Sequence, residues 1–444
     1  MESDRSSREA TVATGTLVVD IIRVRVAFGP ASLGPPASEL PLTTAPRPTI
    51  DSVDVAGRTV LVRVDFNVPL AAGKITDDSR IVAAVPTIRS ILDRDGACVL
   101  MSHLGRPAGT GYEANFSLQP VGARLAELLG RPVVVPGEGS VDDAAAAAVA
   151  AIGPGEVVLL ENLRFHAGEK KADADFAAAL AAYGQVYCQD AFGAAHRGDA
   201  SMVAVPDAMS DSPRVAGRLL EAELKYLADA IESPARPFVA VLGGAKISDK
   251  LGTIRHLAGR VDTLVVGGAM AFTLLRAMGH VVGRSLVEEA MIEEAGEIIK
   301  AVEATSTRLL LPTDFVCAAA PEAGVATTTC GRDIEGDLMG LDIGPESVAS
   351  FAAAVRGAKT VVWNGPMGLF EIPPFDTGTL AVAQAMIEAT EGGGITVVGG
   401  GDTAAAVNDL GLAVGFSHVS TGGGASLRML EGGPMPGVEA LGTV

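Results

Sequence analysis

The chain has 444 residues, which is enough for two or three domains. Its net charge of −19 argues against nucleic acid or an acidic membrane surface as the main partner. Hydrophobic residues make up 48% of the chain and aromatic residues only 4%, a composition that favours helices packed on a parallel sheet over an aromatic-rich β-sandwich.

The four cysteines (Cys98, Cys188, Cys317 and Cys330) are far apart and form no C-x-x-C pair. This spacing supports neither a zinc site nor a redox motif, so we expect reduced thiols of a cytoplasmic protein. No apolar run approaches the roughly 20 residues that span a bilayer.

Residues 1–46 differ in composition from the rest, being rich in Ser, Thr, Pro and Ala. We expect a disordered extension here. Glu2, Asp4 and Glu9 argue against both a secretory signal and a transit peptide. The stretch "TLVVDIIRVRVAF" within the extension could instead form a strand.

From about residue 58, short apolar runs alternate with helical stretches. "RTVLVRVDFNV" precedes "SRIVAAVPTIRSILDRDG", "ACVLMSHLG" precedes "LQPVGARLAELLG", and "EVVLLENLRF" precedes "ADADFAAALAAYG". Near-continuous apolar strands between helices are typical of a parallel sheet covered on both faces. The pattern predicts an α/β domain over residues 47–213.

A helical stretch follows over residues 214–233 and is ended by Pro234 and Pro237. The alternation then restarts with "FVAVLGG", "TLVVGGAMA", "RLLLPTDFV", "TVVWNG", "ITVVGGG" and "HVSTGG". The predicted fold class is therefore α/β, with two doubly wound parallel-sheet, Rossmann-like domains joined by an interdomain helix. We assign residues 234–430 to the second domain and 431–444 to a tail, and expect ligands in a cleft between the domains.

Basic and polar residues follow the apolar runs of the first domain. In doubly wound sheets, ligands bind beyond the carboxyl ends of the strands, so cations gathered there predict an anion pocket in this acidic protein. Each arginine taken alone could also be a solvated surface charge, and Asp65 and Asn67 could merely cap a turn. The set comprises Asp65, Asn67, Arg80, His103, Arg106, Arg164, His196 and Arg197.

The strand ends of the second domain are rich in glycine. "VAVLGGAKISDK" carries Lys246 and Lys250, four residues apart, which predicts two lysines on one helix face near a glycine turn. The alternative is a pair of exposed helix lysines without function. The chain has no G-x-x-x-x-G-K-[ST] motif, so a P-loop enzyme is excluded.

The stretch "VVGGGDTAAAV" (397–407) resembles a dinucleotide fingerprint at Gly399, Gly401 and Ala404. A fingerprint of this kind requires an acid about 20 residues further on, and the region there, "SHVSTGGGASLRML", has no Asp or Glu before Glu431, which argues against an NAD oxidoreductase. Asp402 at a phosphate-binding helix start is reasonable if it ligates Mg²⁺, which neutralises the repulsion. Its alternative role is a helix N-cap.

With these residues in view, the chain resembles phosphoglycerate kinases from about residue 48 to 444. The matching segments are "LVRVDFNVPL", "SHLGRP", "LLENLRFH", "DAFGAAHR", "LGGAKISDK", "WNGPMGLFE", "VVGGGDTAAAV" and "STGGGASL". They are long, specific and in family order. The resemblance implies a hinge-bending kinase with Mg²⁺ and ATP or ADP, and a tail that packs on the N-terminal domain.

The resemblance also implies site residues. The N-terminal domain would bind 3-phosphoglycerate through Asp65, Phe66, Asn67, Arg80, His103, Leu104, Gly105, Arg106, Arg164 and Arg197. The C-terminal domain would bind the nucleotide through Lys250, Gly340, Glu371, Gly400, Gly401, Asp402 and Thr403, with Glu371 on the ribose and Asp402 on the metal. The catalytic candidates are Arg80, Lys246 and Lys250.

Several positions depart from the family pattern. Gln189 stands where Asn is usual, and Gly198 and Asp199 stand where Ala and His are usual. Arg428 and Gly433 replace Glu and Lys. None of these is a predicted site residue, but Asp199 adds a carboxylate beside Arg197 that could weaken the anion pocket.

The predicted activity is reversible phosphoryl transfer between 1,3-bisphosphoglycerate and ADP, giving 3-phosphoglycerate and ATP. Positioning and electrostatics suffice for this chemistry, without a covalent enzyme intermediate. We expect a cytoplasmic monomer with no nucleic acid or membrane partner. The alternative is a non-catalytic relative that binds nucleotide as a scaffold. Loss of a catalytic cation would favour that alternative, and none is lost.

Overall fold

The computed structural model describes residues 47–442. The predicted extension over residues 1–46, with its possible strand, and the last two residues of the predicted tail lie outside the described residues. None of the helices within 47–442 is long and apolar enough to cross a membrane.

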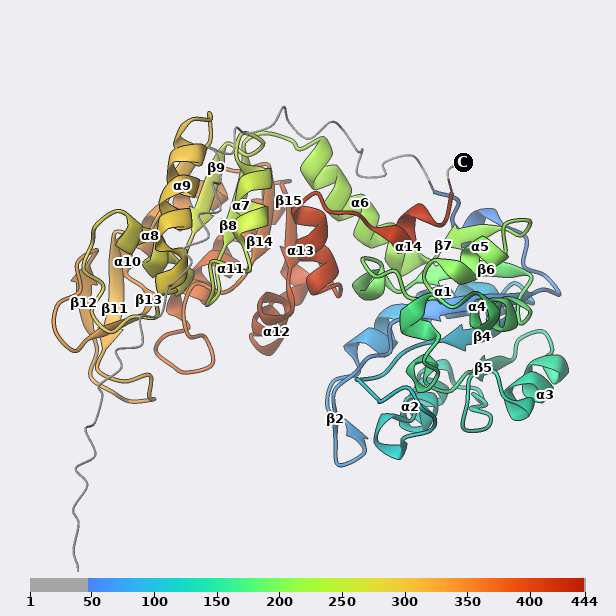
Figure 1. Ribbon diagram of the computed structural model, residues 1–444. Helices are drawn as coiled ribbons and strands as arrows, with labels where there is room; N and C mark the ends of the chain where they lie inside the picture. Colours follow the sequence, from blue (N-terminus) through green and yellow to red (C-terminus); the bar gives the residue numbers. More distant parts are fainter. Residues whose placement is uncertain (1–46, 443–444) are drawn as a thin grey trace, which may run out of the picture. The chain divides into compact units, whose positions relative to one another are not determined.

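The first sheet is built from five parallel strands (Figure 1). In spatial order these are β5 (Val157–Leu159), β4 (Ala97–Met101), β1 (Thr59–Val64), β6 (Val186–Asp190) and β7 (Arg214–Ala216). The helices of this part of the chain are α1 (Ser79–Leu92), α2 (Gln119–Leu129), α3 (Asp143–Ala151), α4 (Ala174–Ala181) and α5 (Ala204–Ala208). A two-stranded hairpin, β2 (Leu70–Ala71) and β3 (Lys74–Ile75), precedes α1.

Alternate residues of each strand serve opposite faces of this sheet. Val60 and Val62 pack in one apolar cluster with residues of α1 and α2, whereas Leu61 packs in another with residues of α4. Both clusters are buried, and each fully buried aliphatic side chain stabilises the fold by about 1.5–3 kcal/mol. This explains why the strands read as continuous apolar runs rather than as alternating ones.

The second sheet has six parallel strands. In spatial order these are β10 (Arg308–Leu310), β9 (Thr263–Val266), β8 (Phe238–Leu242), β14 (Thr360–Asn364), β15 (Ile395–Gly399) and β16 (His418–Val419). The α-helices that follow β8 are α7 (Leu251–Leu257), α8 (Met270–Ala277), α9 (Ile292–Glu303), α10 (Pro345–Arg356), α11 (Thr377–Glu391), α12 (Gly401–Asp409), α13 (Gly424–Leu430) and α14 (Pro436–Glu439).

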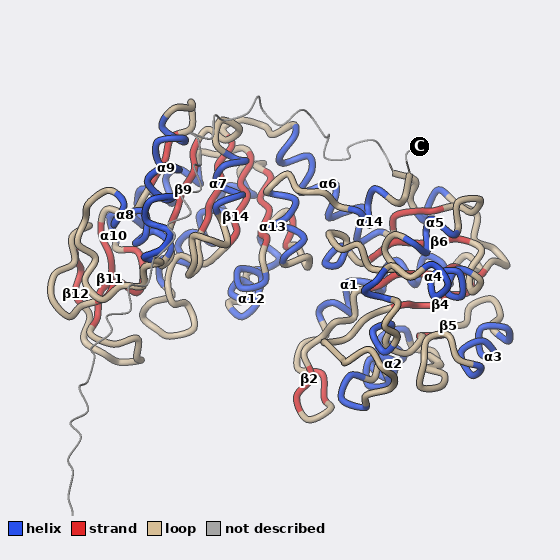
Figure 2. The backbone as a smooth tube through the Cα atoms, in the orientation of Figure 1, coloured by secondary structure: helices blue, strands red, loops and turns tan. Residues whose placement is uncertain are grey.

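Helices cover both faces of the second sheet as well (Figure 2). Val239 and Val241 pack with residues of α10 and α11, while Ala240 and Leu242 pack with residues of α7 and α9. Two parallel sheets, each flanked by helices on both faces, make a doubly wound, Rossmann-like α/β fold. The predicted fold class is confirmed.

Three details differ from the sequence prediction. The run "RLLLPTDFV" was expected as one strand, but it forms β10 and then β11 (Asp314–Ala318), because Pro312 lacks an N–H and restricts the residue before it. β11 pairs antiparallel with β12 (Thr328–Gly331) and β13 (Met339–Ile343) in a third sheet that was not predicted. The expected helix over 214–233 starts later, as α6 (Arg218–Glu232), because residues 214–216 pair with β6.

Contacts also place the end of the described chain. Gly437 N donates to Ala195 O at 2.9 Å, and Arg214 Nη1 donates to Ala440 O at 3.1 Å. Residues 435–442 therefore lie against segments that adjoin β6 and β7 of the first sheet.

Candidate active site

Asp65 and Asn67 follow β1, and Arg80 is the second residue of α1. Arg80 Nη1 donates to Asp65 Oδ2 at 3.0 Å and to Asn67 O at 3.3 Å. Burial acts to raise the pKa of Asp65, but the interactions of its carboxylate with His103, Arg80 and Arg63 outweigh this effect, so the pKa is lowered from 3.8. Asp65 is therefore an ionised carboxylate that holds Arg80 at the carboxyl end of the strand.

The segment after β4 meets the same corner. Asn67 Oδ1 accepts a hydrogen bond from Gly105 N at 2.8 Å, and Arg164 Nη1 donates to Gly105 O at 2.8 Å. Gly105 has φ of +61°, and a Cβ there would lie 2.5 Å from the ring of Phe116. Only glycine fits this turn, which joins the loops that follow β1, β4 and β5.

His103 lies between two guanidinium groups. Its Nδ1 is 3.1 Å from Arg63 Nη2, and its Nε2 is 3.2 Å from Arg197 Nη1. Burial is the largest cause that lowers the pKa of His103, and the charges of Arg63, Arg164 and Arg197 lower it further. Asp65 acts in the opposite direction, but the pKa is still held well below 6.5. The ring is therefore neutral at pH 7. A neutral ring can accept from only one of the two arginines, which leaves the other free for an anion.

The arginines of this edge have few carboxylate partners. Arg106 is exposed and makes no hydrogen bond or ion pair with any residue in 47–442. Arg164 is 9% exposed, and its only ion-pair partner within the described residues is Asp199, at 3.7 Å. Arg80, Arg106, Arg164 and Arg197 thus form a cluster with excess positive charge, which we call the anion pocket. Planar guanidinium groups bind phosphate and carboxylate oxygens in pairs.

Two further predicted residues lie in the core beside this pocket. Phe66 is fully buried, and its N–H donates to Ser102 Oγ at 2.9 Å. Leu104 is 2% exposed, and its N–H donates to Asn162 Oδ1 at 3.1 Å. Their side chains are therefore buried in the core, their N–H groups tie together the loops on which the polar residues lie, and their contact with substrate stays a prediction.

Beside the anion pocket lies a further arginine, Arg63, which was not among the predicted site residues. Arg63 is fully buried within β1 and donates to Ser201 Oγ at 2.8 Å, besides its contact with His103. The signal was present, because an arginine within the apolar run "VLVRVDF" requires buried partners.

A cavity of about 420 Å³ opens beside the second sheet. Gly340, Glu371 and Asp402 line it, in agreement with their predicted place in one site. Much of the wall is apolar and was not predicted, because such residues cannot be told from core residues in sequence. The apolar side chains include Phe272, Leu286, Phe315, Met339, Leu341, Met367, Leu369 and Phe370.

Asp402 lies in the first turn of α12 but does not cap it. The N-cap residue is Gly400, which has φ of +88° and provides no side-chain bond. Asp402 is exposed, and its carboxylate accepts no hydrogen bond within residues 47–442. The alternative role of Asp402 as a helix cap is therefore wrong, and the carboxylate is free to face a ligand at the cavity.

The other residues of the glycine stretch are placed by their neighbours. Thr403 is buried and its Oγ1 accepts from Gly365 N at 2.6 Å. A Cβ on Gly400 would lie 2.9 Å from Asn364 Oδ1, whereas one on Gly401 would meet no atom within 4 Å. The N–H groups at the start of α12 are thus brought close to the end of β14.

Lys250 lies close to the same strand end. Its Nζ donates to Asn364 Oδ1. Burial lowers the pKa of Lys250, while Asp249, Asp402 and Glu431 act in the opposite direction. Asp402 and Lys250 therefore provide opposite charges close together at the start of α12, an arrangement that suits a phosphate and its counterion.

Lys246 does not share a helix face with Lys250, so that prediction is wrong. α7 begins at Leu251, and residues 243–250 form a loop with bends and turns. The glycines that precede the lysines favour such a loop over a longer helix. Lys246 is exposed. Burial acts to raise the pKa of Glu288, but hydrogen bonds to this carboxylate and the charge of Lys246 outweigh burial and lower the pKa.

The donor set fits a metal that arrives with its substrate. Within residues 47–442 there is no group of three or more His, Cys, Asp or Glu side chains that could hold an ion by itself. A single exposed carboxylate at Asp402 suits Mg²⁺, which is commonly bound by one or two carboxylates together with substrate phosphates.

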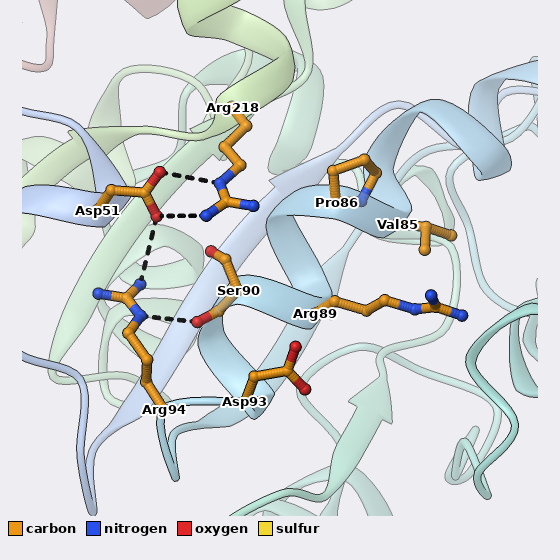
Figure 3. A pocket seen from close by; sticks show the side chains of 8 residues that line it. All are labelled: Asp51, Val85, Pro86, Arg89, Ser90, Asp93, Arg94 and Arg218. Atoms are coloured by element: carbon orange, nitrogen blue, oxygen red, sulfur yellow. Dashed lines mark hydrogen bonds and ion pairs between the residues drawn. The ribbon is translucent and has the colours of Figure 1, made fainter.

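A larger hollow, of about 660 Å³, lies over α1 and the start of α6 (Figure 3). Arg218 donates to both oxygens of Asp51, at 2.8 and 3.1 Å, and Arg94 Nη2 is 3.9 Å from the same carboxylate (Figure 3). Arg89 Nη2 donates to Leu128 O at 2.8 Å. These cations are already paired within the protein, so the hollow lacks the free charge of the anion pocket.

Comparison with known proteins agrees with this geometry. The family described as "Phosphoglycerate kinase" matches residues 50–433. The phosphoglycerate kinase of Rhodopirellula baltica is 51% identical over 397 residues, covering 88% of this chain and 98% of the relative. The one from Chlorobium chlorochromatii is 50% identical over 395 residues, with the same coverage.

Solved structures are similar as well. The phosphoglycerate kinase of Coxiella burnetii has a TM-score of 0.81 and 36% identity, covering 89% of this chain and 99% of that one. The fold and the relatives together define an α/β phosphotransferase. More narrowly, the chain belongs to the phosphoglycerate kinase family.

Proposed function

We propose that this protein catalyses reversible phosphoryl transfer between 1,3-bisphosphoglycerate and ADP, giving 3-phosphoglycerate and ATP. The observation that carries the proposal is the match of residues 50–433 to the phosphoglycerate kinase family. The site agrees with it, because four arginines with only two carboxylate partners within residues 47–442 gather at one sheet edge, and an exposed carboxylate lines a cavity beside the other sheet. No observation favours a scaffold without activity.

The anion pocket is the proposed site of 3-phosphoglycerate. Arg106, Arg164, Arg197 and neutral His103 would bind its phosphate, since arginines pair with phosphate oxygens and a neutral imidazole can donate one hydrogen bond. Asp65 and Asn67 would accept from its hydroxyl group.

The cavity beside the second sheet is the proposed site of the nucleotide. Its apolar wall suits the flat base, and Glu371 would accept from the ribose hydroxyls. The N–H groups of Gly400, Gly401 and Thr403, at the positive end of α12, would face the phosphates together with Lys250. Asp402 would hold Mg²⁺, which neutralises charge on the phosphate oxygens when it is bound.

In the direction of ATP use, a carboxylate oxygen of 3-phosphoglycerate attacks the γ-phosphorus. The bond from this phosphorus to the bridging oxygen of ADP breaks, and ADP leaves with the electron pair. Arg80 and Lys246 are the candidates for stabilising the transferring group, because charge on its oxygens must be matched by preorganised cations. No side chain needs to form a covalent bond.

We further propose a division into residues 47–213 for phosphoglycerate, the α6 region as linker, 234–430 for nucleotide and 431–444 as a tail. Contacts of Gly437 and Arg214 support the last assignment. We also propose a cytoplasmic monomer. The four cysteines are free thiols, which suits a reducing compartment.

A coupled assay tests the activity. Purified protein is supplied with 3-phosphoglycerate, ATP and Mg²⁺, and formation of 1,3-bisphosphoglycerate is followed through NADH oxidation by an added dehydrogenase. We expect turnover that depends on all three components. Binding of nucleotide without turnover in either direction would overturn the proposal and favour the scaffold.

A further inference from the structure

Asp199 lies beside the anion pocket, and Arg164 is its one ion-pair partner within residues 47–442. Its Oδ2 is 3.7 Å from Arg164 Nη2, beyond hydrogen-bond distance, and this oxygen is buried without a hydrogen bond. The side chain accepts no hydrogen bond from any residue in 47–442, and only 8% of the residue is exposed. A buried carboxylate in this state costs folding free energy, so it does not serve to stabilise the protein.

Arg164 is also incompletely used. Its Nη1 donates to Gly105 O, but its buried Nε has no partner. Burial lowers the pKa of Arg164, as does the charge of Arg197, while Asp199 acts in the opposite direction. The guanidinium therefore keeps donors available for a better acceptor than Asp199, such as a phosphate or carboxylate oxygen at hydrogen-bond distance.

The main chain fixes the loop without the help of this side chain. Asp199 O accepts from Met202 N at 2.9 Å and from Val203 N at 3.1 Å. A Cβ on the preceding Gly198 would meet no atom within 4 Å, so the glycine is not required for space. The turn therefore requires neither a glycine at position 198 nor the side chain of Asp199. The carboxylate of Asp199 can be replaced without disturbing the backbone.

We propose that Asp199 is an affinity-determining residue that weakens the binding of the acidic substrate at Arg164. In the free enzyme the carboxylate of Asp199 partly neutralises the charge of Arg164. A bound anion either displaces this carboxylate from Arg164 or is repelled by it. The repulsion acts on the bound substrate and on the transition state alike, so it raises KM and leaves kcat nearly unchanged. This inference rests on the proposed function.

The test compares Asp199→Asn with the parent enzyme. Asn has nearly the same shape and removes the charge. Titration calorimetry measures the Kd of 3-phosphoglycerate without nucleotide, and the coupled assay measures KM and kcat. We expect Kd and KM for 3-phosphoglycerate to fall roughly three- to tenfold, the range of about one modest charge interaction. The KM of ATP should be unchanged.

Two further variants separate charge from structure. Asp199→Ala should also tighten substrate binding, and neither variant should lower Tm. Asp207→Asn removes an exposed charge from α5 in the same part of the chain and should change Kd by less than about twofold, because exposed charges are screened.

Weaker or unchanged binding in both Asp199 variants would overturn the inference. Weaker binding would mean that Asp199 positions Arg164 for the substrate. Failure of the proposed function looks different: the parent enzyme itself would then neither bind 3-phosphoglycerate nor phosphorylate it.

Discussion

Asp65 and Asp402 both follow parallel strands, yet their surroundings give them different chemistry. Asp65 is 8% exposed and is held by Arg80 at 3.0 Å, so its charge is satisfied inside the protein. Asp402 is exposed at the start of a helix and makes no side-chain hydrogen bond within the described part of the chain. Only the second carboxylate is free to bind a cation that arrives with a ligand.

Asp402→Asn tests this role. The variant should fold normally, with a stability loss of less than about 1 kcal/mol from the weaker interaction with the helix dipole. Turnover with Mg²⁺ should collapse, because a neutral amide is a much poorer Mg²⁺ ligand. Nucleotide titration with and without Mg²⁺ should show weaker binding of the Mg-nucleotide only. Equal binding and normal turnover would show that Asp402 does not hold the metal.

Arg80→Ala tests the proposed transition-state role. Loss of one preorganised charge at a transferring group typically costs about 10²- to 10³-fold in rate. The coupled assay should show this fall in kcat, while nucleotide affinity stays near that of the parent. Arg89→Ala, on the exposed side of the same helix, is the control. A fall of less than about threefold in Arg80→Ala would exclude the role.

The gathering of candidate site residues at the edge of the first sheet was largely predictable, because arginine and histidine directly after apolar strands are unusual in an acidic chain. The protonation states and ion-pair partners of these residues were not predictable. That His103 is held neutral between Arg63 and Arg197, and that Arg164 faces Asp199, depends on distances between segments far apart in the sequence. The apolar wall of the cavity beside the second sheet was missed for a similar reason.

At the scale of elements, the start of α6 is held by residues of two other elements. Asp190 Oδ1, at the end of β6, accepts from Leu219 N at 3.0 Å and Leu220 N at 3.2 Å. Thr87 Oγ1, in α1, accepts from Arg218 N at 2.9 Å. Burial raises the pKa of Asp190 to about 7 against the effect of these bonds. The helix start therefore depends on an acid that titrates near neutral pH.

This raised pKa has a predictable effect on stability. Between about pH 4 and pH 7 the folded state binds more protons at Asp190 than the unfolded state, so stability falls as pH rises through this window. Asp190→Asn keeps the Oδ1 acceptor and cannot ionise. Urea unfolding at pH 5 and pH 7.5 should show that the variant gains stability relative to the parent at the higher pH. An unchanged difference would contradict the raised pKa.

The alternation of elements was readable from the sequence, whereas the third sheet was not. β12 is built from "TTCG", a short polar run without apolar periodicity, and its pairing with β11 becomes visible only in space. Lys246 and Lys250 were misplaced because a spacing of four suggests a helix even where glycines keep the backbone in a loop.

At the scale of the whole molecule, the two proposed substrate sites are built on different sheets. Transfer requires reacting atoms roughly 3 to 3.5 Å apart. Small-angle scattering should therefore give a smaller radius of gyration with 3-phosphoglycerate and a nonhydrolysable Mg-nucleotide together than with either one. An identical radius in all three states would mean that no closure accompanies binding.

One apolar cluster runs through residues of both sheets. It includes Leu61 and Tyr187 of the first sheet, Ala240 and Leu264 of the second, and Leu227 of α6. Because the cluster is continuous, we expect the two sheets to unfold together. Neither half can lose its fold without uncovering apolar surface on the other, so a core substitution on one side should lower the melting temperature recorded by probes on both.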